Sequence, residues 1–74
     1  MDRIDVQTAE NNYLDAGINL QDCEADRQRH ISVGCQGGDP WWLTDLLDHD
    51  ARVRAARQLL DRRRRELVAL KVAA

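Results

Sequence analysis

Four side chains in this 74-residue sequence are of the types that bind transition metals: Cys23, His30, Cys35 and His49. Structural zinc sites usually take two of their thiolate or imidazole ligands from one tight pair, such as Cys-x2-Cys. The intervals between these four residues are six, four and thirteen residues, so no such pair occurs. We therefore predict no metal and no cofactor. The two cysteines are interpreted as free thiols, which is typical of a reducing compartment and indicates a cytoplasmic location.

Nucleophilic chemistry has equally little support in the sequence. The hydroxyl residues Thr8, Ser32 and Thr44 have no base and orienting acid at a recognisable motif spacing, and no phosphate-binding glycine loop is present. Acidic residues are numerous but alternate on faces expected to be exposed, away from any deep pocket that would tune their acidity. We predict that the protein is not an enzyme and has no catalytic residues.

A run of four arginines, 62–65, is the most basic feature of the chain. Consecutive side chains on a helix point all round its axis, so this run does not form one flat patch. The chain has 11 basic and 13 acidic residues and a net charge of −2, whereas nucleic-acid-binding domains are usually basic. We interpret the run as a solvated, acid-paired surface. The alternative is a dimeric nucleic-acid-binding regulator that uses Arg57, Arg62, Arg64 and Arg65.

Two tryptophans follow the glycine-rich segment in the middle of the chain. Trp42 is expected to pack against the end of the preceding helix, whereas Trp41 should be exposed. Leu43 and Leu47 occupy flanking positions. Because tryptophan is the residue type most enriched at binding hot spots, Trp41, Trp42, Leu43 and Leu47 form the predicted partner-binding site.

Two apolar stripes, each advancing by alternate steps of three and four residues, determine which elements carry these side chains. The first stripe is Val6, Ala9, Tyr13, Ala16, Leu20 and Cys23, and the second is Trp42, Leu46, His49, Val53, Ala56, Leu60, Leu67 and Leu70. Arg63 interrupts the second stripe and is expected either to end the core or to reach Glu10 or Asp5. Such spacing keeps one face of each helix against a neighbouring helix.

Local signals set the expected boundaries. A helix over about residues 6–31 begins after a cap at Asp5 or Thr8, and Gly17, a weak helix former, is a position where it can break or kink. A turn covers residues 32–39. A second helix over about 40–72 begins with Asp39 as cap and Pro40 at the first helical position. One continuous helix is favoured there over two that break at residues 48–50.

The charges of the two chain ends favour an antiparallel arrangement. Residues 1–26 hold seven acids and one arginine, a charge of −6, while residues 51–74 hold eight basic residues and two acids, a charge of +6. Folding the chain back at the turn places these ends side by side, and it brings Arg27 and Arg29 near Asp45 and Asp48. Exposed pairs contribute only about 0–1 kcal/mol each, so they select orientation more than they stabilise.

The predicted fold is therefore all-α: one domain, residues 1–74, forming an antiparallel, coiled-coil-like two-helix hairpin. Leu43, Leu47, Leu59 and Val68 are apolar but lie off the stripe, so two hairpins are expected to dimerise into a four-helix arrangement. No run of about 18 apolar residues occurs, so no membrane contact is predicted, and the N-terminus has no signal-peptide pattern.

The expected function is that of a non-enzymatic interaction module: an inhibitor, adaptor or co-chaperone of a larger protein. In shape alone the hairpin resembles secretion co-chaperones and phage-encoded inhibitors, and this resemblance implies the same kind of role. A structural subunit that assembles by helix stacking is a further alternative.

Overall fold

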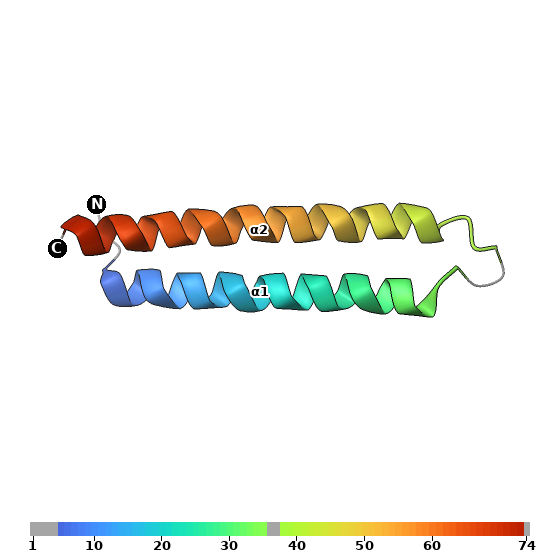
Figure 1. The fold of residues 1–74 in the computed structure, drawn as a ribbon, viewed down its shortest axis with the longest axis horizontal. Coiled ribbons are helices and arrows are strands. Elements are labelled where there is room, and N and C mark those ends of the chain that lie inside the picture. The colour runs from blue at the N-terminus through green and yellow to red at the C-terminus, as the bar shows by residue number, and fades with distance from the viewer. Residues whose placement is uncertain (1–4, 36–37, 74) are drawn as a thin grey trace.

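Two helices make up the described part of the chain. The computed structural model describes residues 5–35 and 38–73, and within them the elements are α1 (Val6–Val33) and α2 (Trp42–Ala73), with no strand. The helices pack side by side and antiparallel, so the start of α1 and the end of α2 lie together at one end of a rod (Figure 1). The predicted all-α fold is confirmed. Neither described helix combines the length and apolar content that crossing a membrane requires.

The seam between α1 and α2 consists of the two predicted stripes. Every residue of both stripes is buried or half-buried, and α1 extends its stripe through Arg27 and His30. The buried apolar residues among those described are Ala9, Ala16, Val53 and Ala56. Three of these four are alanines, and small side chains at the contact allow two helix axes to approach closely. The core is therefore long and thin, one layer of side chains deep.

The start of α1 follows the predicted cap. The carboxylate of Asp5 accepts a hydrogen bond of 2.7 Å from the backbone N–H of Thr8, which satisfies one of the free amides of the first turn. The helix continues without a break through Gly17. It ends at Val33 rather than Ile31, because Gly34 has φ = 74° and takes the chain out of the helix.

The start of α2 is delayed by a capping turn. The Asp39 carboxylate accepts from the N–H of Trp41 at 2.9 Å, and the Asp39 carbonyl accepts from the N–H of Trp42 at 3.3 Å. The helix therefore begins at Trp42 rather than Pro40, and Asp39 lies in the turn before α2 instead of at the predicted cap position. From there α2 is continuous through residues 48–50, as favoured from the sequence. Residues 36–37 of the predicted turn lie outside the described residues.

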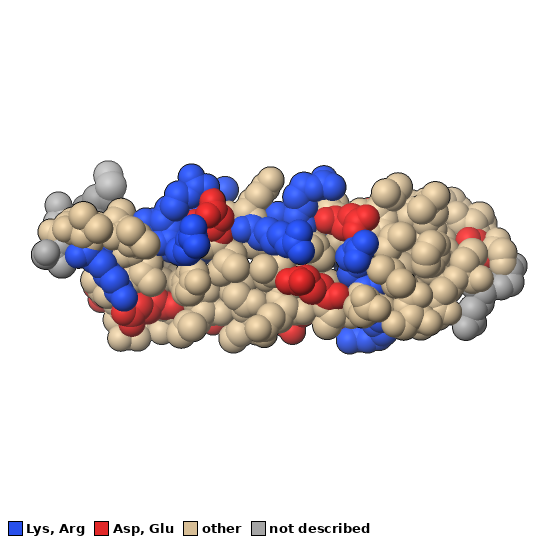
Figure 2. All heavy atoms as spheres, viewed as in Figure 1, with Lys and Arg blue, Asp and Glu red and all other residues tan. Residues whose placement is uncertain are grey.

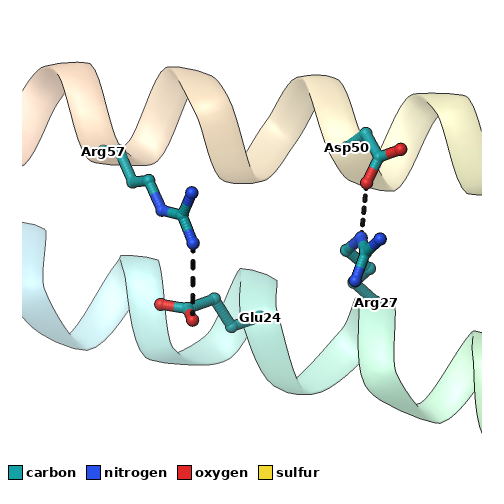
Figure 3. A network of polar contacts seen from close by, with 4 residues as sticks. All are labelled: Glu24, Arg27, Asp50 and Arg57. Carbon is teal, nitrogen blue, oxygen red and sulfur yellow. Dashed lines mark hydrogen bonds and ion pairs between the residues drawn. The ribbon is translucent and has the colours of Figure 1, made fainter.

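Ion pairs between the helices reveal a register different from the expected one. Arg27 pairs with Asp50, not with Asp45 or Asp48, and Arg57 lies 3.9 Å from Glu24 (Figure 3). Both helix boundaries at the turn fall two residues later than predicted, at Val33 and Trp42. The residues that face each other across the helices therefore differ from those expected.

Arg63 also differs from expectation. Its guanidinium bonds to Glu66 of its own helix at 3.0 Å instead of reaching Glu10 or Asp5. Glu10 is paired instead with Lys71, at 3.7 Å. The arginine therefore stays half-buried beside the seam, and apolar residues Leu67 and Leu70 continue the stripe beyond it.

Replacing Gly17 by alanine is expected to stabilise the hairpin. A Cβ at this position would lie 3.9 Å from Leu60 Cδ1, an ordinary van der Waals contact. Alanine also favours the helix over glycine by about 1 kcal/mol. Thermal unfolding followed by circular dichroism should show a free energy of unfolding higher by about 1 kcal/mol. A lower melting temperature would contradict the continuous, closely packed α1 described above.

The cap at Asp5 gives a prediction for pH. The backbone N–H of Thr8, which bonds the carboxylate, lowers the pKa of Asp5 below its ordinary value of 3.8. A depressed carboxylate pKa contributes stability that is present above the unfolded-state pKa and lost as pH falls through the folded-state pKa. Asp5→Ala should therefore melt at a lower temperature than the native chain at neutral pH. This difference should shrink once the pH falls below 3.8 and disappear below the folded-state pKa.

Asp5→Asn is the matched control, because its side-chain oxygen still caps the helix but does not titrate. A difference between Asp5→Ala and the native chain that stays constant down to strongly acidic pH would show that the carboxylate is not the cap.

Candidate interaction site

The tip of the hairpin is closed by a reciprocal contact between His30 and Trp42. The ring of His30 stacks on Trp42, with centroids 5.0 Å apart and planes inclined by 17°. Nε2 of His30 lies 2.9 Å from the Trp42 carbonyl oxygen, and indole Nε1 of Trp42 donates to the His30 carbonyl at 3.4 Å. Because a carbonyl oxygen only accepts, Nε2 of His30 carries the proton. The end of α1 and the start of α2 are thus bonded in both directions.

His49 adds a third ring to this cluster, its centroid 5.1 Å from that of His30. The structure therefore brings together two of the four residues noted in the sequence as possible metal ligands. Cys23 and Cys35 are free thiols elsewhere on the hairpin. Across residues 5–35 and 38–73, no group of three or more His, Cys, Asp or Glu side chains is placed to hold a metal ion.

Trp41 combines an ordered backbone with an exposed side chain. Its N–H is held by the Asp39 carboxylate at 2.9 Å, and its carbonyl accepts from the N–H of Asp45 at 2.9 Å. Its residue surface is nevertheless 68% exposed. The sequence-based distinction between the two tryptophans is thereby confirmed, since Trp42 is half-buried against α1.

Leu43 and Leu47 form a second apolar surface at the tip, 59% and 60% exposed. They lie four residues apart and are neighbours on one face of α2. Both leucines lie within α2, whereas Trp41 precedes its first residue. On the face seen in Figure 2, the tip is almost free of charged side chains, which gather over the middle and the opposite end of the rod.

The arginines of the alternative site are largely paired with acids. Arg57 lies 3.9 Å from Glu24, and both Arg64 and Arg65 pair with Asp61. Arg62 is the exception, with no acidic partner in the described part of the chain. All four arginine side chains are exposed, and three of them form ion pairs. The structure does not gather the four arginines into one unpaired cluster.

The sequence analysis does not place His30 in this contact, because the predicted first stripe ends at Cys23. The signal was present, since Arg27 and His30 follow Cys23 at the same spacings of four and three. Leu14 and Ile18 were also missed; they are 60% and 57% exposed on α1, four residues apart.

No protein-family model, curated protein or solved structure matches this chain. Function is therefore inferred from the chemistry of its surfaces. Those surfaces are an ordered, exposed tryptophan, a leucine pair on α2, and arginines mostly paired with acids.

The adjacent tryptophans provide a matched pair for measuring the contact at the tip. Trp42→Ala removes a ring stack and a hydrogen bond, worth about 1 kcal/mol each, together with part of the apolar burial. It should lower the free energy of unfolding by about 2–3 kcal/mol in a denaturant titration. Trp41→Ala should change it by less than about 0.5 kcal/mol. Equal losses for both variants would show that Trp41 is part of the core.

Proposed function

We propose that this chain is a cytoplasmic, non-enzymatic interaction module that binds a larger protein through the hairpin tip, as an inhibitor, adaptor or co-chaperone. The observation that carries the proposal is Trp41, which is 68% exposed although its backbone is hydrogen-bonded on both sides. An exposed tryptophan on a mobile segment would lose conformational entropy on binding. Here the capping turn has already fixed its position.

The chemistry of the tip suits a protein partner. A tryptophan offers a large apolar area together with one N–H donor, the combination that makes it common in the buried centres of interfaces. The Asp39 and Asp45 backbone contacts place this side chain at the end of a rigid rod. We expect the partner to present an apolar pocket that receives Trp41, surrounded by polar groups.

Self-association is the second part of the proposal. Among the described residues, eight large apolar side chains are at least half exposed: Leu14, Ile18, Val33, Trp41, Leu43, Leu47, Val68 and Val72. A chain of 74 residues with only four buried apolar residues among those described has little core of its own. We therefore propose that the working form is a homodimer with four helices.

A capture experiment tests the role of the tip. The full chain is immobilised and used to capture proteins from an extract of its native host, in parallel with Trp41→Ala and with the double variant Arg62→Ala, Arg64→Ala. We expect Trp41→Ala to weaken capture of a specific protein by about tenfold or more, as for a hot-spot residue. The double arginine variant should capture it normally, and both variants should retain native helicity.

The opposite result would favour the nucleic-acid alternative. In that case Trp41→Ala behaves normally, the double arginine variant loses function, and the chain binds random DNA. Phosphate contacts would be recognised by a steep fall in affinity with rising salt, because each neutralised phosphate releases counterions. Weak, salt-independent retention of DNA would not count as such binding.

A further inference from the structure

One flank of the hairpin is marked by a groove between the helices. This groove, of about 450 Å³, is lined mainly by charged residues of both helices: Glu24, Arg27, Gln28, Asp50, Val53, Arg54 and Arg57. The pairs Arg27–Asp50 and Arg57–Glu24 cross it (Figure 3). We call the side of the rod that carries this groove the ion-paired flank.

The seven-residue repeat places four exposed apolar side chains on the ion-paired flank. Leu43 precedes Asp50 by one repeat, and Leu47 precedes Arg54 by one. Val68 follows Arg54 by two repeats, and Leu14 precedes Gln28 by two. Because residues one repeat apart face the same side of a helix packed in this way, all four project beside the groove. They are 53–60% exposed.

These residues form two apolar areas separated by charge. Leu43 and Leu47 lie at the tip. Leu14 and Val68 lie toward the other end, where Lys71 pairs with Glu10 at 3.7 Å. Leu14 comes one turn after Glu10, and Val68 about one turn before Lys71, so the two lie at the same level along the rod. Acids and arginines occupy the middle of this flank, as the face in Figure 2 shows.

We infer that the ion-paired flank is the surface on which a second copy of this chain docks, an inference that rests on the proposed self-association. The first argument is size. The rod measures 57 × 18 × 17 Å between Cα atoms, so one long face covers roughly 1,000 Å². A stable interface needs about 800 Å² from each partner. One face of this hairpin meets that requirement only when most of its length is used.

The second argument is charge complementarity. On this flank Glu10 and Glu24 of α1 pair with Lys71 and Arg57 of α2, and Arg27 of α1 pairs with Asp50 of α2. A second copy that lays its α1 over this α2 presents an opposite charge to each of these three α2 side chains. Two copies related by a two-fold axis along the rod have this geometry, with both tips at the same end.

The same two-fold axis places the apolar areas of the two copies at the same levels along the rod. It brings Leu14 of each copy to the level of Val68 of the other, and it gathers Leu43 and Leu47 of both copies at one end. In the reverse arrangement, tip to tail, α2 of one copy lies against α2 of the other. Arg57, near the middle of α2, would then face Arg57 of the other copy. Like charges in direct opposition are destabilising, so the tip-to-tip dimer is favoured.

Self-association and binding of a larger protein are proposed to use different side chains of the tip. Leu43 lies in the seven-residue repeat of the ion-paired flank, whereas Trp41 precedes the first residue of α2. One dimer presents two copies of Trp41 at the same end.

Sedimentation equilibrium of the purified chain tests the surface. At tens of micromolar the native chain should have twice its 8.5 kDa mass. The double variant Leu43→Glu, Leu47→Glu should weaken self-association by at least about tenfold, because unpaired charges would be buried at the interface. Trp41→Glu adds the same kind of charge at the tip but outside the seven-residue repeat of this flank, and it should leave the dimer intact. Circular dichroism checks that all variants remain helical.

Two results would overturn this inference. A native chain of 8.5 kDa at these concentrations excludes the dimer itself, while the capture experiment with Trp41→Ala remains an independent test of the tip. A dimer that persists in the double variant Leu43→Glu, Leu47→Glu excludes this surface but not self-association.

Cross-linking tests the orientation. In a Cys23→Ala, Cys35→Ala background, Leu43→Cys should be joined to its own copy by a short bismaleimide reagent, because the two tips lie together. Trp41→Cys in the same background is the matched control and should remain uncrosslinked. If a mixture of Leu47→Cys and Val68→Cys chains gives the only covalent dimer, the arrangement is tip to tail and the inferred axis is wrong.

Discussion

The hairpin is held together by a seam only one side chain deep between α1 and α2. Each helix offers one stripe to the other, and the buried positions among the described residues are Ala9, Ala16, Val53 and Ala56. Small side chains let the helices approach closely but contribute little apolar area, and burial is worth about 25 cal/mol per Å². The stability of the hairpin therefore depends on its ends and its flanks as well as on its core.

Contacts at the tip compensate for part of this deficit. The paired bonds between His30 and Trp42 join the helices where the chain reverses, and Asp39 satisfies free amides at the start of α2. These contacts also define what the tip exposes. Once Trp42 is directed inward, its neighbour Trp41 is directed outward, and the same turn that completes the fold holds the proposed binding residue in place.

The charges act mainly on orientation. Pairs such as Arg57–Glu24 and Lys71–Glu10 join exposed side chains at 3.7–3.9 Å, where each contributes at most about 1 kcal/mol. Their pattern is more informative than their strength, because along one flank Glu10 and Glu24 of α1 face bases of α2, while Arg27 of α1 faces Asp50. A surface with this pattern is complementary to itself, which connects the fold of one chain to the proposed assembly of two.

Both helices, the seam between them and the opposite directions of Trp41 and Trp42 were predictable from the amino-acid sequence alone. Apolar spacing of three and four residues sets the direction of a stripe around a helix axis, and a cap such as Asp5 acts only on neighbours within one turn. These are local properties, so no knowledge of the partner helix was needed. The helix is unbroken at Gly17, because packing along the whole of α1 outweighs the modest cost of one glycine.

The register of the two helices was settled only by their packing in three dimensions. Periodicity fixes rotation about an axis but not translation along it, so the level at which the two helices face each other was not predictable from the stripes. In the structure Arg27 lies beside Asp50 and Glu10 lies beside Lys71. The stack of His30 on Trp42 likewise joins residues twelve apart across the turn, a contact that exists only once both helices are in place.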